Sequence, residues 1–274
     1  MTMRRRYIVG SGWWCDDELD APLEPGNRAL YGDEKIRSSA FHHLWYYSVD
    51  KFTSPEKIII VDSNSPVAPA INDNDKRIEF VSLAVNSGHA INAIHHLSGW
   101  TKSVLLGLQY AMFSEVEYFV YVEQDTLLKG GAIVEYCIDR MKKPWMFGSG
   151  MGTPQPLQQS FMIFDMRFAS QFIANYLNIQ KADRIVSPEQ KFVIACNGFP
   201  KFLEWAALRF RDRKRRKVLK KFSNYDTLPM GYGRSRPINF DDKLFYFQHG
   251  NRQELERYCS LVGVPQDVVQ KALG

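Results

Sequence analysis

The chain has 274 residues, of which 45% are hydrophobic and 24% are charged. These values are those of an ordinary globular protein with a sizeable core, and they fit one large domain or two small ones. The net charge of +5 comes largely from one segment, residues 209–221, and no apolar run reaches the ~18–20 residues that span a bilayer.

Three arginines at residues 4–6 resemble the basic start of a signal peptide. The stretch that follows, residues 7–15, is too short for such a peptide and is interrupted by Gly10 and Gly12, which argues against secretion. The four cysteines lie far apart and lack Cys-x-x-Cys spacing: Cys15, Cys137, Cys196 and Cys259. They predict neither a zinc site nor a disulfide framework, so the expected location is the reducing cytoplasm.

Strand and helix patterns alternate through the first half of the chain. The expected elements are a strand at 7–10, a loop to about 27, a helix at 35–50, strands at 57–62 and 77–85, a helix from 101, a strand from 118 and a helix to 141. Residues 57–62 contain four consecutive β-branched residues, which indicates a strand buried on both faces. The alternation predicts an α/β fold with a mostly parallel central sheet flanked by helices.

The second half of the chain reads differently. Strands are expected at 145–150 and 160–164, followed by two helices, the basic run, a Gly- and Pro-rich loop at 229–237, a strand at 243–249 and a polar C-terminal helix. No internal repeat or low-complexity linker divides the chain. We therefore expect one compact domain over 1–274 with two halves, 1–130 and 131–274.

The strand from residue 118 ends on two carboxylates, Glu123 and Asp125, one residue apart. In open α/β sheets, ligands bind at the ends of buried strands. Two carboxylates there suit a hard divalent cation that carries a diphosphate, and such a cation neutralises the charge on a departing nucleoside diphosphate. The alternative is that the acids are ordinary turn residues or helix caps.

Three motifs in order resemble the GT-A glycosyltransferases. The first is Lys-Ile-Ile-Ile-Val-Asp-Ser-Asn-Ser from Lys57, the second is Asn-Ser-Gly-His-Ala from Asn86, and the third is the Glu-Gln-Asp of residues 123–125. The resemblance covers residues 7–130. It implies a GT-A, Rossmann-like fold and an enzyme that takes a sugar from a nucleotide-diphosphate donor.

The resemblance also implies roles for individual residues. Asp62 and Ser63 would face the nucleotide, and Glu-Gln-Asp would stand in for the family's Asp-x-Asp, with Asp125 as a ligand of Mn²⁺ or Mg²⁺. The first position departs from the family because Glu123 is one methylene longer than Asp. Glu123 is therefore expected at the ribose, or at the metal through a water molecule.

The strand at 243–249 ends on His249, and a late histidine completes the metal site in some GT-A enzymes, so His249 is expected as a second metal ligand. An imidazole beside a carboxylate favours Mn²⁺ slightly over Mg²⁺. Upstream, Arg234 and Arg236 lie in a Gly-rich loop, and their guanidiniums match the geometry of a diphosphate. The alternatives are a histidine bonded to a nearby carbonyl and an ordinary basic surface loop.

An inverting transfer needs a base that removes the proton of the acceptor hydroxyl. Ser187-Pro188-Glu189-Gln190 predicts a helix start with a capping box. In inverting members of the family the base is commonly an acid at such a helix start, so Glu189 is the expected base, with Asp165 and Asp183 as weaker rivals. Glu189 also suits the helix dipole alone, and a retaining reaction would need no such base.

The basic run at 209–221 follows an aromatic and apolar stretch. This combination suits an anionic membrane surface, where the enzyme would meet a carbohydrate or lipid-linked acceptor as a peripheral protein. A solvated helix face is the simpler interpretation. Nucleic acid is disfavoured because the sequence has no helix-turn-helix, zinc-finger or RNA-recognition signature.

Two other functions compete with the transferase. A sugar-1-phosphate nucleotidyltransferase shares the α/β core and the cation, but the loop after its first strand is rich in Gly, Arg and Lys. Here the loop reads Gly-Ser-Gly-Trp-Trp-Cys-Asp-Asp, which is acidic and aromatic. A non-catalytic polyanion-binding protein built on residues 209–221 is the rival from another class.

Overall fold

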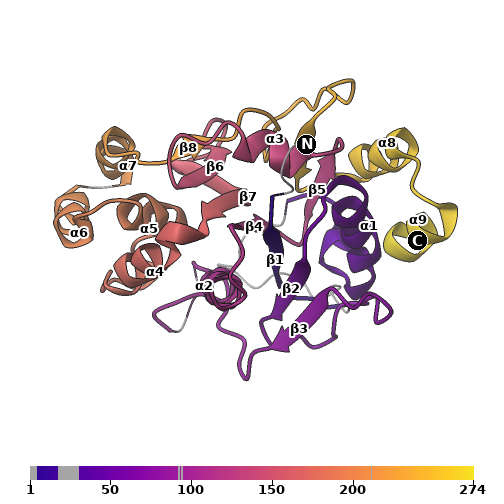
Figure 1. Cartoon of the computed structure of the whole chain (residues 1–274), viewed down its shortest axis with the longest axis horizontal. Helices are drawn as coiled ribbons and strands as arrows, with labels where there is room; N and C mark the ends of the chain where they lie inside the picture. The colour runs from indigo at the N-terminus through magenta and orange to yellow at the C-terminus, as the bar shows by residue number, and fades with distance from the viewer. Residues whose placement is uncertain (1–4, 18–30, 92, 94, 211) are drawn as a thin grey trace.

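A computed structural model describes residues 5–17, 31–91, 93, 95–210 and 212–274, the side chains of 212 and 213 excepted (Figure 1). Residues 1–4, and with them part of the basic start, lie outside the described residues, as does most of the loop expected to end near residue 27. A seven-stranded sheet forms the centre, in the order β3-β2-β1-β4-β7-β6-β8. The strands in that order are β3 (Ile78–Ser82), β2 (Lys57–Asp62), β1 (Tyr7–Trp13), β4 (Tyr118–Val122), β7 (Leu157–Asp165), β6 (Trp145–Ser149) and β8 (Asp226–Thr227).

The sheet is mostly parallel. β1 pairs in parallel with β2 and β4, β2 pairs in parallel with β3, and only β7 runs antiparallel to its neighbours β4 and β6. Parallel neighbours need crossover connections: α1 (His42–Phe52) lies between β1 and β2, α2 (Gly99–Phe113) lies between β3 and β4, and residues 63–77 join β2 to β3 without a helix. The predicted fold class is confirmed as an α/β arrangement with a mostly parallel, Rossmann-like central sheet flanked by helices, which is consistent with the expected GT-A fold.

The two faces of the sheet are covered by α1 and α2, which lie on opposite sides in Figure 1. Successive residues of β2 alternate between them: Ile58 and Ile60 join the core cluster that contains α1, and Ile59 joins the cluster that contains α2. Because successive residues face opposite helices, all four residues at 58–61 are apolar, as predicted for a strand buried on both faces.

A second, two-stranded sheet pairs β5 (Thr126–Lys129) with β9 (Phe245–Gln248) in antiparallel fashion. The sequence predicted β9, although longer, but it did not predict β5. Because β5 begins directly after Asp125 and Thr126 lies opposite Gln248, this pairing carries the end of β9 to the acidic turn. The acidic turn and the end of β9, about 120 residues apart in the sequence, are thereby held side by side.

Residues 131–274 contain a cluster of helices at one end of the molecule: α4 (Ala169–Leu177), α5 (Pro188–Ala195), α6 (Pro200–Leu208) and α7 (Asp212–Lys221) (Figure 1). Two helices were predicted before the basic run, and the structure has three. Of these three, α5 begins where the sequence predicted a helix start, and α6 begins with Pro200 at its first position, a position that proline favours. Residues 212–221 of the basic run form the helix α7.

Several boundaries differ from the prediction. The helix expected at 35–50 begins as two short 3-10 turns, Glu34–Arg37 and Ser39–Phe41, and the C-terminal helix is two helices, α8 (Arg252–Val262) and α9 (Gln266–Leu273). Gly263 separates them with a left-handed φ of 66°, which ends α8. The remaining elements are α3 (Ile133–Ile138) and the 3-10 turn Met166–Phe168. In the described part of the chain, every helix is too short or too polar to cross a bilayer.

Candidate functional site

The acidic pair occupies the turn that joins β4 of the large sheet to β5 of the small one. The backbone N–H of Glu123 donates to the Ser160 carbonyl at 2.9 Å, and the N–H of Thr126 donates to the Glu123 carbonyl at 2.9 Å. The first bond continues the pairing of β4 with β7, and the second closes the turn. The backbone that carries Glu123 and Asp125 is therefore fixed by the pairing of both sheets.

Gln248 connects the two acids. Its Nε2 donates to Glu123 Oε2 at 2.7 Å and to Asp125 Oδ1 at 3.0 Å, and its Oε1 accepts from Arg234 Nε at 3.2 Å. The side chain is buried at the last position of β9. One amide thus sets the orientation of both carboxylates and links them to a guanidinium. The sequence analysis assigned Gln248 no role.

His249 lies against Asp125. Its Nε2 is 3.1 Å from Asp125 Oδ2, and the Asp125 side chain is 11% exposed. Burial alone would raise the pKa of the Asp125 carboxyl, but the charge of His249 and hydrogen bonds from His249 and Gln248 outweigh burial and lower that pKa to about 2. Asp125 is therefore an ionised carboxylate at neutral pH.

The backbone at His249 has an uncommon conformation, with φ of 56° in the left-handed region that disfavours side chains. Arg236 supports it: Nη2 donates to the carbonyls of Gln248 and His249 at 2.9 and 3.2 Å, and Nε pairs with Glu254 at 2.6 Å. The ring of Tyr31 stacks on the imidazole at 5.8 Å between centroids. These contacts turn the imidazole of His249 towards Asp125.

The loop that carries the two arginines is bonded to β9. Tyr232 N donates to the Tyr246 carbonyl and Gln248 N donates to the Gly233 carbonyl, each at 2.8 Å. Gly233 has φ of 53°, and a Cβ there would lie 2.2 Å from Gln158 Oε1, so glycine is required. Arg234 is thereby held over Gln248. Arg236 is engaged by the backbone and by Glu254, and its role at a phosphate stays a prediction.

Gln124, the middle residue of the acidic motif, holds the exit of β1. Its Oε1 accepts from Trp14 N at 2.7 Å and its Nε2 donates to the Trp14 carbonyl at 3.1 Å. The Gln124 amide therefore bonds to both backbone groups of Trp14, as a residue of a neighbouring strand would. These bonds fix the aromatic segment after β1 beside the acids. In the sequence this residue was only the spacer between Glu123 and Asp125.

Asp62 and Ser63 close β2 and are buried. The Asp62 carboxylate accepts from the backbone N–H and the hydroxyl of Ser65 and, at 2.7 Å, from the hydroxyl of Ser82. These bonds are those of a turn residue that caps the strand exit. The Ser63 hydroxyl packs against Gly99 at the start of α2, where a Cβ would lie 2.4 Å from it. Their contact with a nucleotide remains a prediction.

Glu189 is in the first turn of α5, whose start is where the sequence placed it. Ser187 Oγ accepts from Gln190 N at 3.5 Å, with Pro188 at the first helical position. The reciprocal half of the predicted capping box is missing, since Gln190 Oε1 has no hydrogen-bond partner within the described chain. Ser187 Oγ also lies 3.1 Å from Gln155 Oε1, to which it donates. As the catalytic base, Glu189 remains a prediction.

The two rival acids have structural partners. Asp165 accepts from the backbone N–H and guanidinium of Arg167. Asp183 is fully buried with Lys191, at 2.7 Å, and accepts from Ser98 N and Thr101 Oγ1 at 2.8 and 2.6 Å. Asp183 thus ties the start of α2 to α5, and removing its charge would leave a buried ammonium unpaired.

The residues at the strand ends fit a divalent cation that brings its own ligands. Two adjacent ligands of an octahedral cation with bonds of about 2.1 Å are ~3.0 Å apart, close to the 3.1 Å between Asp125 Oδ2 and His249 Nε2. Among the described residues, no three His, Cys, Asp or Glu side chains form a group that could hold a metal alone. Substrate phosphates and water commonly complete such a shell.

No protein-family model matches the chain, and no curated protein matches it. It is similar in structure to the galactosyltransferase LgtC with donor and acceptor sugar analogues, at 12% identity over 97% of this chain and 99% of that one, with a TM-score of 0.42. The mannosyltransferase PcManGT from Pyrobaculum calidifontis with GDP-Man and Mn²⁺ is 10% identical over 81% of this chain and 74% of its own, TM-score 0.43. HddC from Yersinia pseudotuberculosis is 8% identical over 94% and 99%, TM-score 0.41. Because these identities and TM-scores are low, an activity can be inferred only from the chain's own residues.

Proposed function

We propose that this protein is a glycosyltransferase that moves a sugar from a nucleotide-diphosphate donor to an acceptor hydroxyl. One observation carries the proposal: the end of β9 lies against the turn after β4, so that Gln248 bonds to both Glu123 and Asp125, and His249 lies 3.1 Å from Asp125. Oxygen and imidazole ligands meet there at the edge of a mostly parallel sheet, where such folds bind ligands. Residues 1–274 would form one domain, with a donor half at 1–130 and an acceptor half at 131–274.

Each residue of this cluster has a separate task. Asp125 and His249 would hold Mn²⁺ or Mg²⁺, and the cation supplies positive charge against the leaving diphosphate when it is bound. Arg234 would contact the phosphates, since Gln248 aims its guanidinium at the same place, and Arg236 would keep His249 in position. Glu123, with Asp62 and Ser63, would address the nucleoside.

The proposed transfer inverts the anomeric centre. Glu189 would accept the proton of the acceptor hydroxyl as the sugar passes through an oxocarbenium-like state. The acceptor would be a carbohydrate or a lipid-linked sugar, met by a cytoplasmic enzyme. The support for Glu189 is its place at a helix start in the acceptor half and its chemistry. Glu189→Gln should leave donor binding intact and remove transfer.

A thermal-shift screen of nucleoside diphosphates with and without Mn²⁺ tests the proposal. A ligand that binds only the folded state raises the melting temperature, by several degrees when its concentration is ~100 times Kd. We expect one nucleoside diphosphate to raise the melting temperature in the presence of Mn²⁺ and much less in its absence. No shift with any nucleotide would contradict the proposal.

Product analysis separates the transferase from a nucleotidyltransferase. With the sugar donor of the nucleotide that the screen selects, a transferase releases nucleoside diphosphate and no pyrophosphate. With the matching nucleoside triphosphate and a sugar-1-phosphate, only a nucleotidyltransferase releases pyrophosphate. The control is Asp75→Asn, at an acid that bonds to Arg77 and to Tyr46 of α1 and not to the acidic turn. It should behave as the wild type in both assays.

A further inference from the structure

The most exposed aromatic cluster of the described chain lies on α6, in a part of the molecule that the proposed function does not use. Phe199, Phe202 and Trp205 are 51%, 54% and 53% exposed. They follow one another at intervals of three along one face of the helix, and the opposite face buries Leu203 and Ala207. The cluster is therefore an outward-facing ridge and not part of the core.

The aromatic side chains form a continuous surface because they pack on one another. The rings of Phe199 and Phe202 are 6.2 Å apart, those of Phe202 and Trp205 are 6.0 Å apart, and Phe222 after α7 meets Phe199 at 6.5 Å. The guanidinium of Arg209 lies 4.1 Å from the centre of the Trp205 ring. We call Phe199, Phe202, Trp205 and Phe222 the aromatic ridge.

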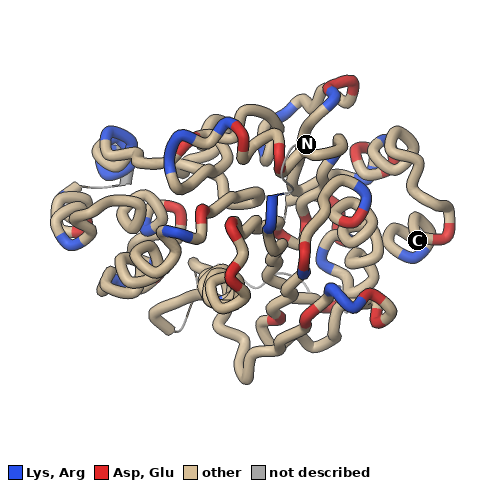
Figure 2. Tube along the Cα trace, in the orientation of Figure 1, with Lys and Arg blue, Asp and Glu red and all other residues tan. Residues whose placement is uncertain are grey.

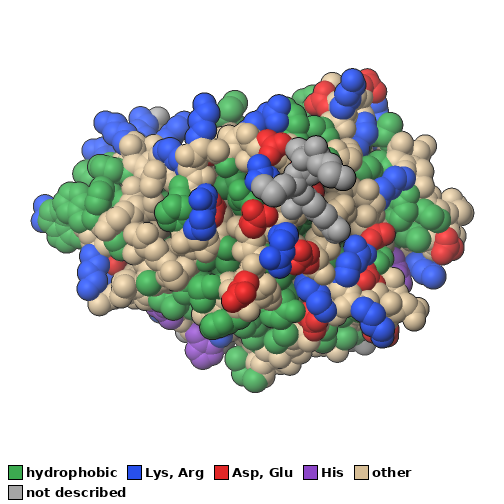
Figure 3. Space-filling view, viewed as in Figure 1, with side chains coloured by type: hydrophobic (Ala, Val, Ile, Leu, Met, Phe, Trp, Pro, Cys, Tyr) green, Lys and Arg blue, Asp and Glu red, His purple; other side chains and the backbone are tan. Residues whose placement is uncertain are grey.

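Dense positive charge borders the aromatic ridge. Residues 209–221 contain nine Lys or Arg and one Asp, an excess of +8, whereas the whole chain carries only +5. The rest of the chain is thus slightly acidic. Figure 2 shows the basic residues along α7, and Figure 3 shows hydrophobic side chains at the left end, over α6, with Lys and Arg beside them over α7.

The basic side chains of α7 have two kinds of role. The guanidiniums of Arg215 and Arg216 donate to the carbonyls of Ile185 and Pro154 and fasten the helix. Four exposed lysines form neither an ion pair nor a hydrogen bond through their ammonium groups with any described residue: Lys214, Lys217, Lys220 and Lys221. Their charge faces solvent beside an apolar surface.

We propose that the aromatic ridge and these four lysines bind the surface of a membrane rich in anionic phospholipid. Phe and Trp favour the boundary between head groups and acyl chains, and lysines beside them gain from the negative surface potential. A nucleic acid would use the same charge, but it stacks bases on separate aromatic faces, and here the ring of Phe199 packs edge-on against those of Phe202 and Phe222. The inference stands apart from the transferase proposal because binding is measured without turnover.

Vesicle flotation tests the proposal. The full-length chain should float with vesicles of phosphatidylcholine and phosphatidylglycerol and remain in solution with phosphatidylcholine alone. Added salt should weaken the binding, and each Lys→Gln change at 217, 220 and 221 should lower partitioning roughly fivefold. The double variant Phe202→Ser, Trp205→Ser should lower it by roughly tenfold to a hundredfold.

Fluorescence gives a reading specific to the ridge. Trp205 is the most exposed of the tryptophans, so binding to anionic vesicles should shift the emission to the blue. Trp205→Phe should abolish that shift and still float. Phe113→Ser, at an 81% exposed phenylalanine at the end of α2, is the matched control and should bind as the wild type.

Three outcomes would overturn the proposal. The first is equal flotation with neutral and anionic vesicles. The second is undiminished binding by the Phe202→Ser, Trp205→Ser variant, with its fold verified by circular dichroism. The third is binding of single-stranded DNA or of a second copy of the chain that depends on the ridge, without binding of vesicles.

Discussion

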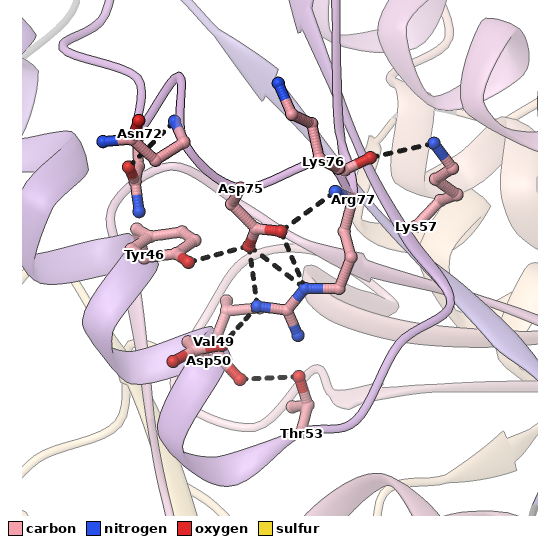
Figure 4. A network of polar contacts seen from close by, with 10 residues as sticks. Tyr46, Val49, Asp50, Thr53, Lys57, Asn72, Asp75, Lys76 and Arg77 are labelled. Carbon is pink, nitrogen blue, oxygen red and sulfur yellow. Dashed lines mark hydrogen bonds and ion pairs between the residues drawn. The ribbon is translucent and has the colours of Figure 1, made fainter.

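Two polar networks in this molecule hold pairs of carboxylates in different ways. In the first, beside β3 and α1, Arg77 donates through Nε and Nη2 to Asp75 at 3.0 and 2.7 Å and also contacts Asp50, and Tyr46 donates to Asp75 at 2.7 Å (Figure 4). In the second, at the ends of β4 and β9, two carboxylates are joined by the neutral amide of Gln248.

The difference separates a structural network from a site. Around Arg77, both acids, Asp75 and Asp50, lie against one guanidinium that the chain itself supplies. Around Gln248, an amide with no net charge orients Glu123 and Asp125, and an imidazole that can itself bind a metal lies against Asp125, which suits this cluster to a cation from outside the chain. The predictions below break one network at a time, from the largest expected effect to the smallest.

Removing the charge of Asp125 should have the largest effect. Asp125→Asn keeps the size of the side chain and an oxygen that can accept from Gln248, but it removes the anionic ligand. We expect a loss of turnover of roughly a thousandfold or more, since a bound cation supplies several kcal/mol to the leaving group. The Mn²⁺-dependent thermal shift with a nucleoside diphosphate should disappear as well.

The control for this change is Asp75→Asn in the Arg77 network. It should lower the melting temperature of the unliganded protein and leave the Mn²⁺-dependent shift in place. If Asp125→Asn retained the shift while Asp75→Asn lost it, the assignment of the two networks would be reversed.

Removing the amide of Gln248 should have an intermediate effect. Gln248→Leu leaves both carboxylates without the donor that orients them, and changes to such supporting groups typically cost about 10- to 100-fold in metal affinity or activity. The concentration of Mn²⁺ needed for half of the thermal shift should rise by a similar factor. Asn197→Leu, at a buried amide that donates to the carbonyls of Val193 and Phe222 in the helical cluster, should not change that concentration.

The same comparison shows how far the sequence could predict the fold. The strands at 57–62 and 118–122 were predicted closely because their β-branched and aromatic runs are buried on both faces and need no information from elsewhere. β5 was not predicted, since Thr126 to Lys129 form a strand only when β9 pairs with them.

For the site, the sequence identified residues whose type carries the chemistry and missed those that position them. Asp125 and His249 were predicted as partners, and they lie 3.1 Å apart. Gln248 and Gln124 have common, uncharged side chains, so only the pairing of β9 with β5 and the exit of β1 reveal what they do. Arg236 was predicted at a phosphate, and its contacts with the backbone of His249 depend on an approach of two segments that no local pattern encodes.

Breaking the Arg77 network should reduce stability without affecting the site. Arg77→Leu removes several bonds to Asp75 and Asp50, and because the Arg77 side chain is 33% exposed, we expect a loss of about 1–2 kcal/mol in the free energy of unfolding. Urea unfolding measures it. Arg167→Leu removes a pair of the same spacing with Asp165, but Arg167 is 79% exposed, and its loss should be smaller.

The smallest effect is the pH dependence of that stability difference. Hydrogen bonds from Arg77 outweigh desolvation and hold the pKa of the Asp75 carboxyl well below its ordinary value. A carboxyl whose pKa is lower in the folded state contributes stability above its unfolded pKa of about 3.9, and the contribution is lost as the pH falls through the folded pKa. The gap in unfolding free energy between wild type and Arg77→Leu should therefore be full at neutral pH and begin to shrink below about pH 4. A gap that stayed constant or widened on acidification would show that Arg77 stabilises the fold by packing and not through the charge of Asp75.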